Sequence, residues 1–220
     1  MYFIIAGLSG TGRNLAGLLV EEGNEVVVVD SDEERCTEMA ASSDVMVITG
    51  DATQKSVLEE ARVSRADALI ALTDNDSDNL MICMTAKEMG AKKVISLVND
   101  AVHAETFKQA GVGFQVKPHA VVAKHICRMI LQPYVREFLF FERAEIFEIE
   151  IEEGMKCVGK KVSKVGATAT NGIKILVLER EGKYLSEDTK IEPKDWLTLI
   201  VDRKSTKKGI EFMNKCFIKG

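Results

Sequence analysis

The fold is decided by the stretch Tyr2-Phe3-Ile4-Ile5-Ala6-Gly7-Leu8-Ser9-Gly10-Thr11-Gly12. Its five apolar residues, Tyr2–Ala6, predict a buried strand, and the amphipathic segment Arg13–Glu22 after the glycines predicts a helix. A glycine-rich turn that joins a strand to a helix is the setting in which a G-x-G-x-x-G pattern binds a phosphate. The start of the chain therefore predicts a nucleotide-binding strand–turn–helix unit.

The alternation of strand and helix continues to about Pro118. Short apolar runs predict further strands at Glu25–Asp30, Val45–Thr49, Ala68–Leu72, Val94–Val98 and Gly113–Val116. Amphipathic stretches predict helices at Asp32–Ala41, Lys55–Ala61, Asp76–Met89, Val102–Ala110 and His119–Leu131. Because strands that are apolar on both faces belong to buried parallel sheets, we predict an α/β fold in residues 1–143, with a Rossmann-like doubly wound parallel sheet.

The pattern changes after Gln132-Pro133. Residues 134–141 are rich in aromatic side chains, and Ala144–Glu152 alternates apolar residues with glutamates, which is typical of a half-exposed antiparallel strand. Two more apolar runs, Gly172–Glu179 and Trp196–Asp202, predict further strands. We therefore predict a second, smaller α+β domain in residues 144–220.

The composition of the 220-residue chain argues against several classes of protein. Its 29 Lys and Arg residues against 34 Asp and Glu give a net charge of −5, which is unlike a dedicated nucleic-acid binder. No run approaches the ~20 apolar residues of a membrane span, and the N-terminus does not resemble a signal peptide. The five cysteines contain no C-x-x-C pair, so no metal site is indicated. We expect a cytoplasmic protein without direct membrane insertion.

The glycine turn departs from the usual pattern at one position. Gly7 and Gly12 match the first and third glycines, Ser9 replaces the second, and Gly10 is an additional glycine. Asp30, at the end of the next predicted strand, lies 18 positions after Gly12, near the spacing expected for a carboxylate that binds ribose hydroxyls. Such a carboxylate would repel a 2′-phosphate. The alternative is a glycine-rich turn with an unrelated, solvated aspartate.

Two more loops leave the same edge of the predicted sheet. They are Gly50-Asp51-Ala52-Thr53 and Thr73-Asp74-Asn75-Asp76. Because ligands of open α/β sheets bind outside the carboxyl ends of the strands, Asp51 is expected beside the adenosine end of a ligand, with Thr73 and Asp74 on its other side. The alternative for the second loop is that its polar residues only cap the following helix.

Together these motifs resemble a known family. The turn 7–12, Asp30, the loop 50–53, Ala66-Asp67-Ala68, the stretch 72–80 and Lys117-Pro118 resemble the RCK (KTN) domain of Trk/Ktr potassium-uptake regulators. Residues from Ala144 onward, including Lys194-Asp195-Trp196-Leu197, are similar to the small C-terminal domain of the same proteins. The resemblance covers nearly the whole chain, and its first half is the more specific.

The resemblance implies a cytosolic gating subunit and not an enzyme. Such subunits pair through the helix that corresponds to His119–Leu131 and form rings, as homo- or hetero-oligomers, beneath a membrane potassium transporter. They bind an adenine nucleotide (AMP, ADP or ATP) or NAD(H). The implied binding residues are Gly7, Leu8, Ser9, Gly10, Thr11, Gly12, Asp30, Ser31, Arg35, Asp51, Ala52, Thr73 and Asp74.

Three departures from the family pattern concern the phosphate end of the site. Ser9 replaces a glycine, Gly10 provides no basic side chain, and Leu97 stands where many members have an arginine. The half of the site that would read adenosine is unchanged. We therefore expect AMP, or NAD(H) held mainly by its AMP half, to bind better than ATP.

Two alternatives to this function stay open at this stage. A small NAD-dependent oxidoreductase would need a proton donor, yet His103, His119 and His125 lie in no pattern that identifies one. A nucleotide sensor with a partner other than a channel fits the same motifs.

Two surfaces also allow two interpretations. A pairing surface is predicted by the apolar residues Ile126, Met129, Ile130 and Leu131, with the aromatic run to Phe141, but these residues could instead pack on their own sheet. Similarly, the glutamates at 148, 150, 152 and 153 suggest an exposed strand face more than a cation site.

Overall fold

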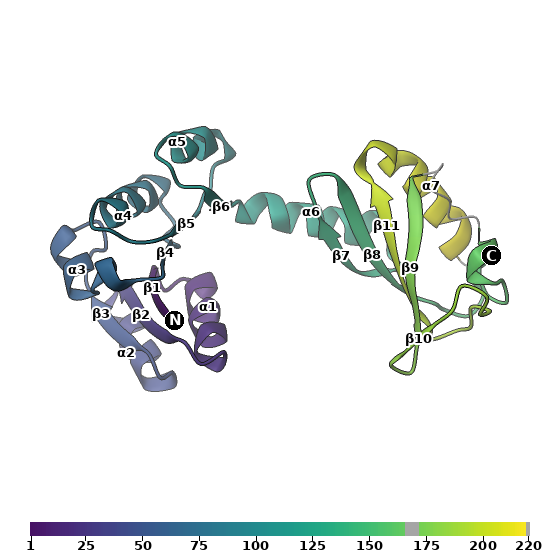
Figure 1. Ribbon diagram of the computed structural model, residues 1–220, viewed down its shortest axis with the longest axis horizontal. Coiled ribbons are helices and arrows are strands. Elements are labelled where there is room, and N and C mark those ends of the chain that lie inside the picture. The colour runs from purple at the N-terminus through teal and green to yellow at the C-terminus, as the bar shows by residue number, and fades with distance from the viewer. Residues whose placement is uncertain (166–171, 219–220) are drawn as a thin grey trace. The chain divides into compact units, whose positions relative to one another are not determined.

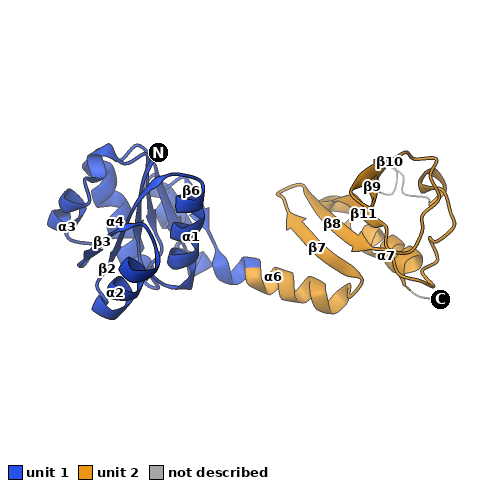
Figure 2. Ribbon diagram, turned by 90° about the horizontal axis from the view of Figure 1, so that it is seen from below, with its two compact units in different colours: residues 1–121 blue, residues 122–220 orange. Residues whose placement is uncertain are grey.

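A computed structural model describes residues 1–165 and 172–218 and divides the chain into two units, residues 1–121 and 122–220 (Figures 1 and 2). The division falls inside helix α6 (Pro118–Leu131). The domain boundary between residues 143 and 144 was placed by a change of composition and not by contacts, and it stays a prediction.

The first unit contains a six-stranded parallel sheet with the strand order β3-β2-β1-β4-β5-β6. The predicted doubly wound sheet is therefore confirmed. From β1 the chain proceeds outward to β2 and β3, and then it returns to β4 on the other side of β1. The strands are β1 Tyr2–Ala6, β2 Glu25–Asp30, β3 Met46–Thr49, β4 Ala68–Ala71, β5 Val94–Leu97 and β6 Phe114–Val116.

The helices of this unit connect the strands as the amphipathic segments predicted. Helix α1 begins three residues before the predicted Arg13, because Gly10–Gly12 already adopt the first helical turn. The predicted segment Val102–Ala110 contains a 3₁₀ turn, Ala101–His103, before its helix. The helices are α1 Gly10–Glu21, α2 Glu33–Ser42, α3 Lys55–Glu60, α4 Asp76–Glu88 and α5 Ala104–Gln109, and a further 3₁₀ turn is Val63–Arg65.

Apolar side chains cover both faces of the parallel sheet. Ile4 belongs to one buried cluster and its neighbour Ile5 to another, and Val27 and Val28 divide in the same way. This division follows from the alternation of side chains along a strand. The strands are thus apolar on both faces, which is why their runs in the sequence contain few charges.

The second unit is a five-stranded antiparallel sheet with the order β10-β9-β11-β8-β7, accompanied by residues 122–131 of α6 and by helix α7. The predicted α+β architecture is confirmed, and the three predicted strands correspond to β8, β9 and β11. The sequence prediction missed β7, β10 and α7. The elements are β7 Val135–Phe140, β8 Ala144–Glu150, β9 Ile173–Arg180, β10 Lys183–Leu185, β11 Trp196–Asp202 and α7 Thr206–Phe217, with 3₁₀ turns at Val162–Lys164 and Arg203–Ser205.

None of the helices within the described ranges is both long enough and apolar enough to cross a lipid bilayer.

Candidate nucleotide-binding site

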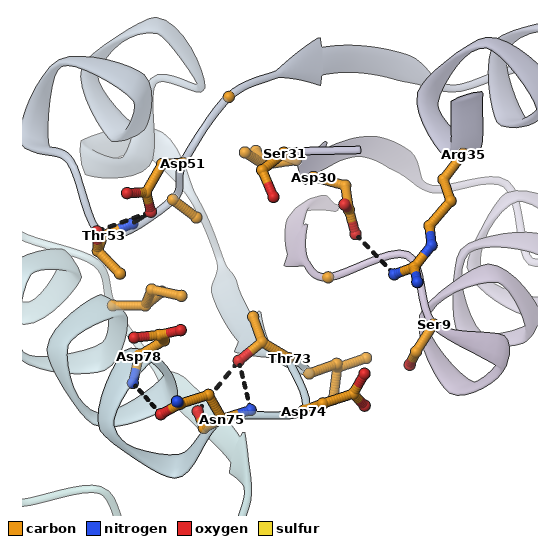
Figure 3. Close-up of a pocket in the computed structure, with 16 residues that line it drawn as sticks. Ser9, Asp30, Ser31, Arg35, Asp51, Thr53, Thr73, Asp74, Asn75 and Asp78 are labelled. Atoms are coloured by element: carbon orange, nitrogen blue, oxygen red, sulfur yellow. Dashed lines mark hydrogen bonds and ion pairs between the residues drawn. The ribbon is translucent and has the colours of Figure 1, made fainter. Parts of the chain in front are cut away.

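A pocket of about 250 Å³ opens where β1, β2, β3 and β4 end (Figure 3). It lies at the point where the strand order reverses, which is where open α/β sheets bind ligands. The loops that follow these four strands provide most of its wall. Its lining residues are Gly7, Ser9, Val29, Asp30, Ser31, Arg35, Gly50, Asp51, Ala52, Thr53, Leu72, Thr73, Asp74, Asn75, Asp78 and Ile82.

Two glycines of the turn after β1 are required by the backbone. Gly7 has a φ of +108°, and a Cβ on it would lie 2.8 Å from the carbonyl carbon of Leu72. A Cβ on Gly12 would lie 1.9 Å from the carbonyl oxygen of Gly7. By contrast, a Cβ on Gly10 would meet nothing within 4 Å. The turn therefore keeps the two glycines that its own packing needs, and Ser9 at the pocket wall is compatible with it.

The N-terminus of α1 is open toward an anion. A helix leaves its first N–H groups without acceptors inside the helix. At α2 and α4 the caps Asp32 and Asn75 accept hydrogen bonds from such groups through their side chains, but the side chain of Ser9 makes no capping hydrogen bond at α1. The first N–H groups of α1, together with the positive end of its dipole, can therefore bind a phosphate.

Asp30 is held in place by the backbone around the pocket. Its carboxylate accepts hydrogen bonds from the N–H groups of Leu8, at 2.5 Å, and Asp32, at 2.9 Å. The Arg35 guanidinium lies 4.0 Å from the same carboxylate, and the Asp30 side chain is only 9% exposed. Because a carboxylate has about four acceptor positions, Asp30 keeps acceptor capacity for ligand hydroxyls while its orientation is fixed.

Asp51 is also fixed by a neighbour in its own loop. It accepts hydrogen bonds from the backbone N–H of Thr53, at 2.9 Å, and from the Thr53 hydroxyl, at 2.7 Å. The hydrogen bond from the Thr53 side chain is the main reason why the pKa of Asp51 is lowered from its ordinary value. Asp51 is thus an ionised acceptor at neutral pH.

Asn79, which is fully buried, fixes the loop after β4 by hydrogen bonds to Thr73. The side-chain oxygen of Asn79 accepts hydrogen bonds from the N–H, at 2.9 Å, and the hydroxyl, at 2.8 Å, of Thr73. Its side-chain amide group donates to the carbonyl oxygen of Thr73 at 2.9 Å. Asn99 also donates to this carbonyl, at 3.3 Å. Thr73 is therefore presented to the pocket in one fixed orientation.

A second carboxylate, Asp76, connects the start of α4 to the loop after β5. It accepts hydrogen bonds from the N–H groups of Asn99 and Asp100, at 2.7 and 2.9 Å, and its carboxylate lies 2.8 Å from Nδ1 of His103. Burial alone would raise the pKa of Asp76, but these hydrogen bonds lower it. The hydrogen bond with Asp76 in turn raises the pKa of His103.

Most of the predicted binding residues line the pocket. The structure brings together Gly7, Ser9, Asp30, Ser31, Arg35, Asp51, Ala52, Thr73 and Asp74. Leu8, Gly10, Thr11 and Gly12 do not line it: the side chain of Leu8 is buried, and Thr11 lines a separate groove. The sequence analysis did not assign Asn75, Asp78 or Ile82, which the first turns of α4 bring to the pocket. The signal that could have identified them is their spacing of three and four positions, which places Asn75, Asp78 and Ile82 on one face of the helix.

Other candidate centres lie away from this pocket. A larger apolar groove of about 680 Å³ on the first unit contains few polar groups, so volume alone does not identify a nucleotide site. His103 pairs with Asp76 and His125 packs on Phe138, and none of the three histidines lines the pocket. In the parts of the chain that the structure describes, no three His, Cys, Asp or Glu residues form a metal-binding group.

The thiol of Cys83, in the core of the first unit, is a poor nucleophile. Cys83 is buried, and burial raises its pKa to about 12. Cys127 is exposed on α6, outside the pocket.

Comparison with known proteins identifies a family for the first unit. The TrkA-N domain matches residues 3–118. A Trk system potassium uptake protein TrkA homolog of Methanothermobacter thermautotrophicus is 35% identical over 170 residues, which cover 76% of this chain and 78% of that protein. A TrkA homolog of Pyrococcus abyssi is 30% identical over 220 residues and covers 96% of both chains.

Solved structures share the fold at lower identity. The GsuK channel bound to NAD matches the chain with a TM-score of 0.65 and 20% identity, covering all of this chain and 40% of that one. The Kef CTD of Shewanella denitrificans in its AMP-bound form matches with a TM-score of 0.51 and 24% identity, covering 60% of this chain and 82% of that one.

Proposed function

The chain belongs to the TrkA-N domain family, and from this premise we propose that it is a cytoplasmic regulatory subunit of a Trk/Ktr-type potassium uptake system. It binds an adenine nucleotide or NAD(H), and the bound nucleotide controls ion flux through a separate membrane transporter subunit at the inner face of the membrane. It acts as a regulator and not as an enzyme. The names of the TrkA homologs, one of which spans nearly the same length, support this proposal.

One observation carries the nucleotide site. Ser9, the N-cap residue of α1, whose side chain makes no capping hydrogen bond, and the anchored carboxylate of Asp30 line the same pocket, at the reversal of strand order. The first suits a phosphate and the second suits a ribose diol. The pocket thus supplies both kinds of recognition that a nucleotide needs, without a large net positive charge.

The ligand favoured by the proposal is AMP, or NAD(H) held by its AMP half. A volume of about 250 Å³ is small for a ligand pocket, which suits one nucleotide better than an entire dinucleotide. Structural neighbours are described as NAD-bound and AMP-bound. Arg35 already lies beside the carboxylates of Asp30 and Asp32, at 4.0 and 3.4 Å, so it is not a free cation for a phosphate chain.

Calorimetric titration of the purified chain with AMP, ADP, ATP, NAD, NADH and NADP tests this proposal. AMP or NAD(H) is expected to bind most tightly and NADP weakly. Asp30→Ala is expected to abolish binding while the fold survives, and Asp30→Asn shows how much depends on charge alone. Asp44→Asn, an exposed aspartate outside the pocket, is the matched control. Unchanged affinity in Asp30→Ala, or ATP as the tightest ligand, would contradict the proposed site.

We further propose that the chain assembles into a ring, with itself or with a second RCK-type subunit. Helix α6 supports this, because five of its apolar side chains are more than half exposed: Val122 (56%), Ile126 (52%), Met129 (62%), Ile130 (72%) and Leu131 (57%). Phe138 of the aromatic run, by contrast, is buried in the core of its own unit and is not part of this surface. Large exposed apolar patches are uncommon on monomers.

Light scattering during gel filtration tests the assembly, and co-purification with a Trk-type membrane protein tests the partner. The chain is expected to elute as a dimer or larger oligomer, and Ile126→Glu with Ile130→Glu should give monomers. A matched change on a polar, exposed position of the first unit, Glu60→Lys, should leave the oligomer intact. A monomeric wild-type chain would argue against a homomeric ring.

A further inference from the structure

We propose that Asp74 is a specificity residue that disfavours nucleotides with extended phosphate chains. The inference rests on the proposed nucleotide site and adds a cause to its preference for AMP over ATP. Ser9 in place of a glycine, and Gly10 without a basic side chain, would remove favourable contacts with a terminal phosphate. Asp74 would add repulsion of that phosphate, and specificity commonly depends on both effects.

The pocket has an unusual balance of charge for a site that binds an anion. Four carboxylates line it, and Arg35 is the one Lys or Arg residue in its lining. Asp30 accepts hydrogen bonds from two N–H groups, and Asp51 accepts two hydrogen bonds from Thr53. Over residues 1–165 and 172–218, the carboxylates of Asp74 and Asp78 have no hydrogen-bond or ion-pair partner. Two carboxylates therefore line the pocket with no such partner in this part of the chain.

The two unpaired carboxylates lie on different sides of the pocket. In Figure 3 the Asp74 side chain points toward Ser9, at the N-terminus of α1, and Asp78 lies on the side of Asp51 and Thr53. Because phosphates bind at the start of this helix, Asp74 is the carboxylate that a growing phosphate chain meets. Asp30 and Asp51 lie at the ribose end, where neutral hydroxyls can donate hydrogen bonds to them.

The electrostatic repulsion between Asp74 and a bound nucleotide increases with the number of charged phosphates in the ligand. The N–H groups at the start of α1 provide only partial positive charges, which suffice for one phosphate or a pyrophosphate diester. ATP brings two more phosphoryl groups than AMP, and no side chain of the pocket is free to neutralise them. Repulsion between one carboxylate and these groups at a partly solvated site corresponds to about a tenfold loss of affinity.

Titration of AMP and ATP into the wild type and Asp74→Asn, at low and high salt and in EDTA, tests the assignment. Asp74→Asn is expected to raise ATP affinity about tenfold and AMP affinity less, so that the AMP-to-ATP ratio falls. High salt should reduce the ratio in the wild type and change it little in the variant. Asp78→Asn should have a smaller effect, and Asp44→Asn, which removes the same charge outside the pocket, should have none.

The outcomes separate this inference from the function on which it rests. If AMP binds the wild type more tightly than ATP but Asp74→Asn leaves the ratio unchanged, the nucleotide site stands and the role of Asp74 is wrong. An equal effect of Asp44→Asn would also overturn it, because net charge would then be the cause. If no adenine nucleotide binds the wild type, both proposals fail. Circular dichroism of each variant establishes that the fold is retained.

Discussion

The two units use charged residues in opposite ways. Residues 1–121 contain 10 Lys and Arg against 19 Asp and Glu, a net charge of −9, whereas residues 122–220 contain 19 against 15, a net charge of +4. In the first unit, carboxylates gather at the sheet edge, and two of them, Asp74 and Asp78, have no hydrogen-bond or ion-pair partner among the described residues. In the second unit, acids and bases pair with each other, as in Arg128–Glu145 and Arg180–Asp195.

This difference shows what an anion-binding site needs in an acidic unit. The net charge of the first unit opposes the binding of a nucleotide, so backbone N–H groups and geometry must provide the attraction. In the second unit, Arg128–Glu145 and Arg180–Asp195 are ion pairs in which the carboxylate is buried, so these charges support the fold. Variants that disturb one unit and not the other are therefore the most direct tests of the contrast.

The largest effect is expected from Asp195→Ala in the second unit. Asp195 is fully buried and accepts hydrogen bonds from Nε and Nη2 of Arg180, at 2.6 and 2.9 Å, and from the N–H of Glu192, at 2.8 Å. Its loss removes three hydrogen bonds to a buried carboxylate, which together cost about 4 kcal/mol, while Arg180 keeps its ion pair with Glu192 at 2.9 Å. Denaturant unfolding should show this loss, while nucleotide affinity at the first unit is retained.

The exposed ion pair Lys161–Asp188 supplies the control. Asp188 has 82% of its side chain exposed, so Asp188→Ala should change stability by less than about 1 kcal/mol. If Asp195→Ala abolished nucleotide binding with the fold of the first unit intact, the separation of roles between the units would be wrong.

The next largest effect is expected from Gly12→Ala in the first unit. A Cβ at this position would lie 1.9 Å from the carbonyl oxygen of Gly7, so the turn or the helix must move, at a cost of about 3 kcal/mol. Nucleotide binding should be lost with it. Gly10→Ala is the matched control, because a Cβ there meets nothing within 4 Å. Equal thermal stability of the two variants would show that the turn does not depend on this close approach.

The first unit was predictable from its sequence because burial on both faces gives uninterrupted apolar runs. Glu25–Asp30 was predicted to the residue. The second unit was harder, since its elements are half exposed. Strand β7 shifts register between Val135 and Glu137, which interrupts the alternation, and α7 opens with polar residues and Gly209, so its apolar positions begin only at Ile210. Its strand β11, which alternates regularly, was predicted at its correct bounds.

The candidate site was predictable at the level of loops and not of side chains. Strand ends placed Asp30, Asp51 and Thr73 correctly at one edge, because parallel strands share their direction. The sequence does not reveal which carboxylates accept hydrogen bonds from the backbone. The N–H group of Leu8, for example, donates to Asp30, which is 22 residues later in the chain, and no local pattern predicts such a contact.

A smaller effect is expected from Asn79→Ala, which tests how the pocket wall is supported. Removal of this buried amide leaves the N–H, hydroxyl and carbonyl groups of Thr73 with fewer partners, at a cost of about 2 kcal/mol. Nucleotide affinity should fall although Asn79 does not line the pocket. Thr85→Ala, farther along the same helix, is the control. Full affinity in Asn79→Ala would mean that Thr73 needs no support.

The smallest effect concerns pH and the pair His103–Asp76. The pKa of His103 is raised above its ordinary 6.5, so its contribution to stability is complete below that pH and disappears as the pH rises through the raised value. The pKa of Asp76 is lowered from 3.8, so its contribution is present above that value and is lost only in acid. Asp100, the other charged group beside His103, favours its protonated form as well.

Thermal unfolding at pH 6 and pH 8.5 measures this contribution. The wild type should lose more of its stability between these pH values than His103→Gln, because the variant has no proton to release in this range. His119→Gln, which removes another exposed histidine, should retain the wild-type pH dependence. Because the pair joins the start of α4 to the loop after β5, a pH dependence of nucleotide affinity that disappears only in His103→Gln would extend the role of the first unit's edge from binding to pH response.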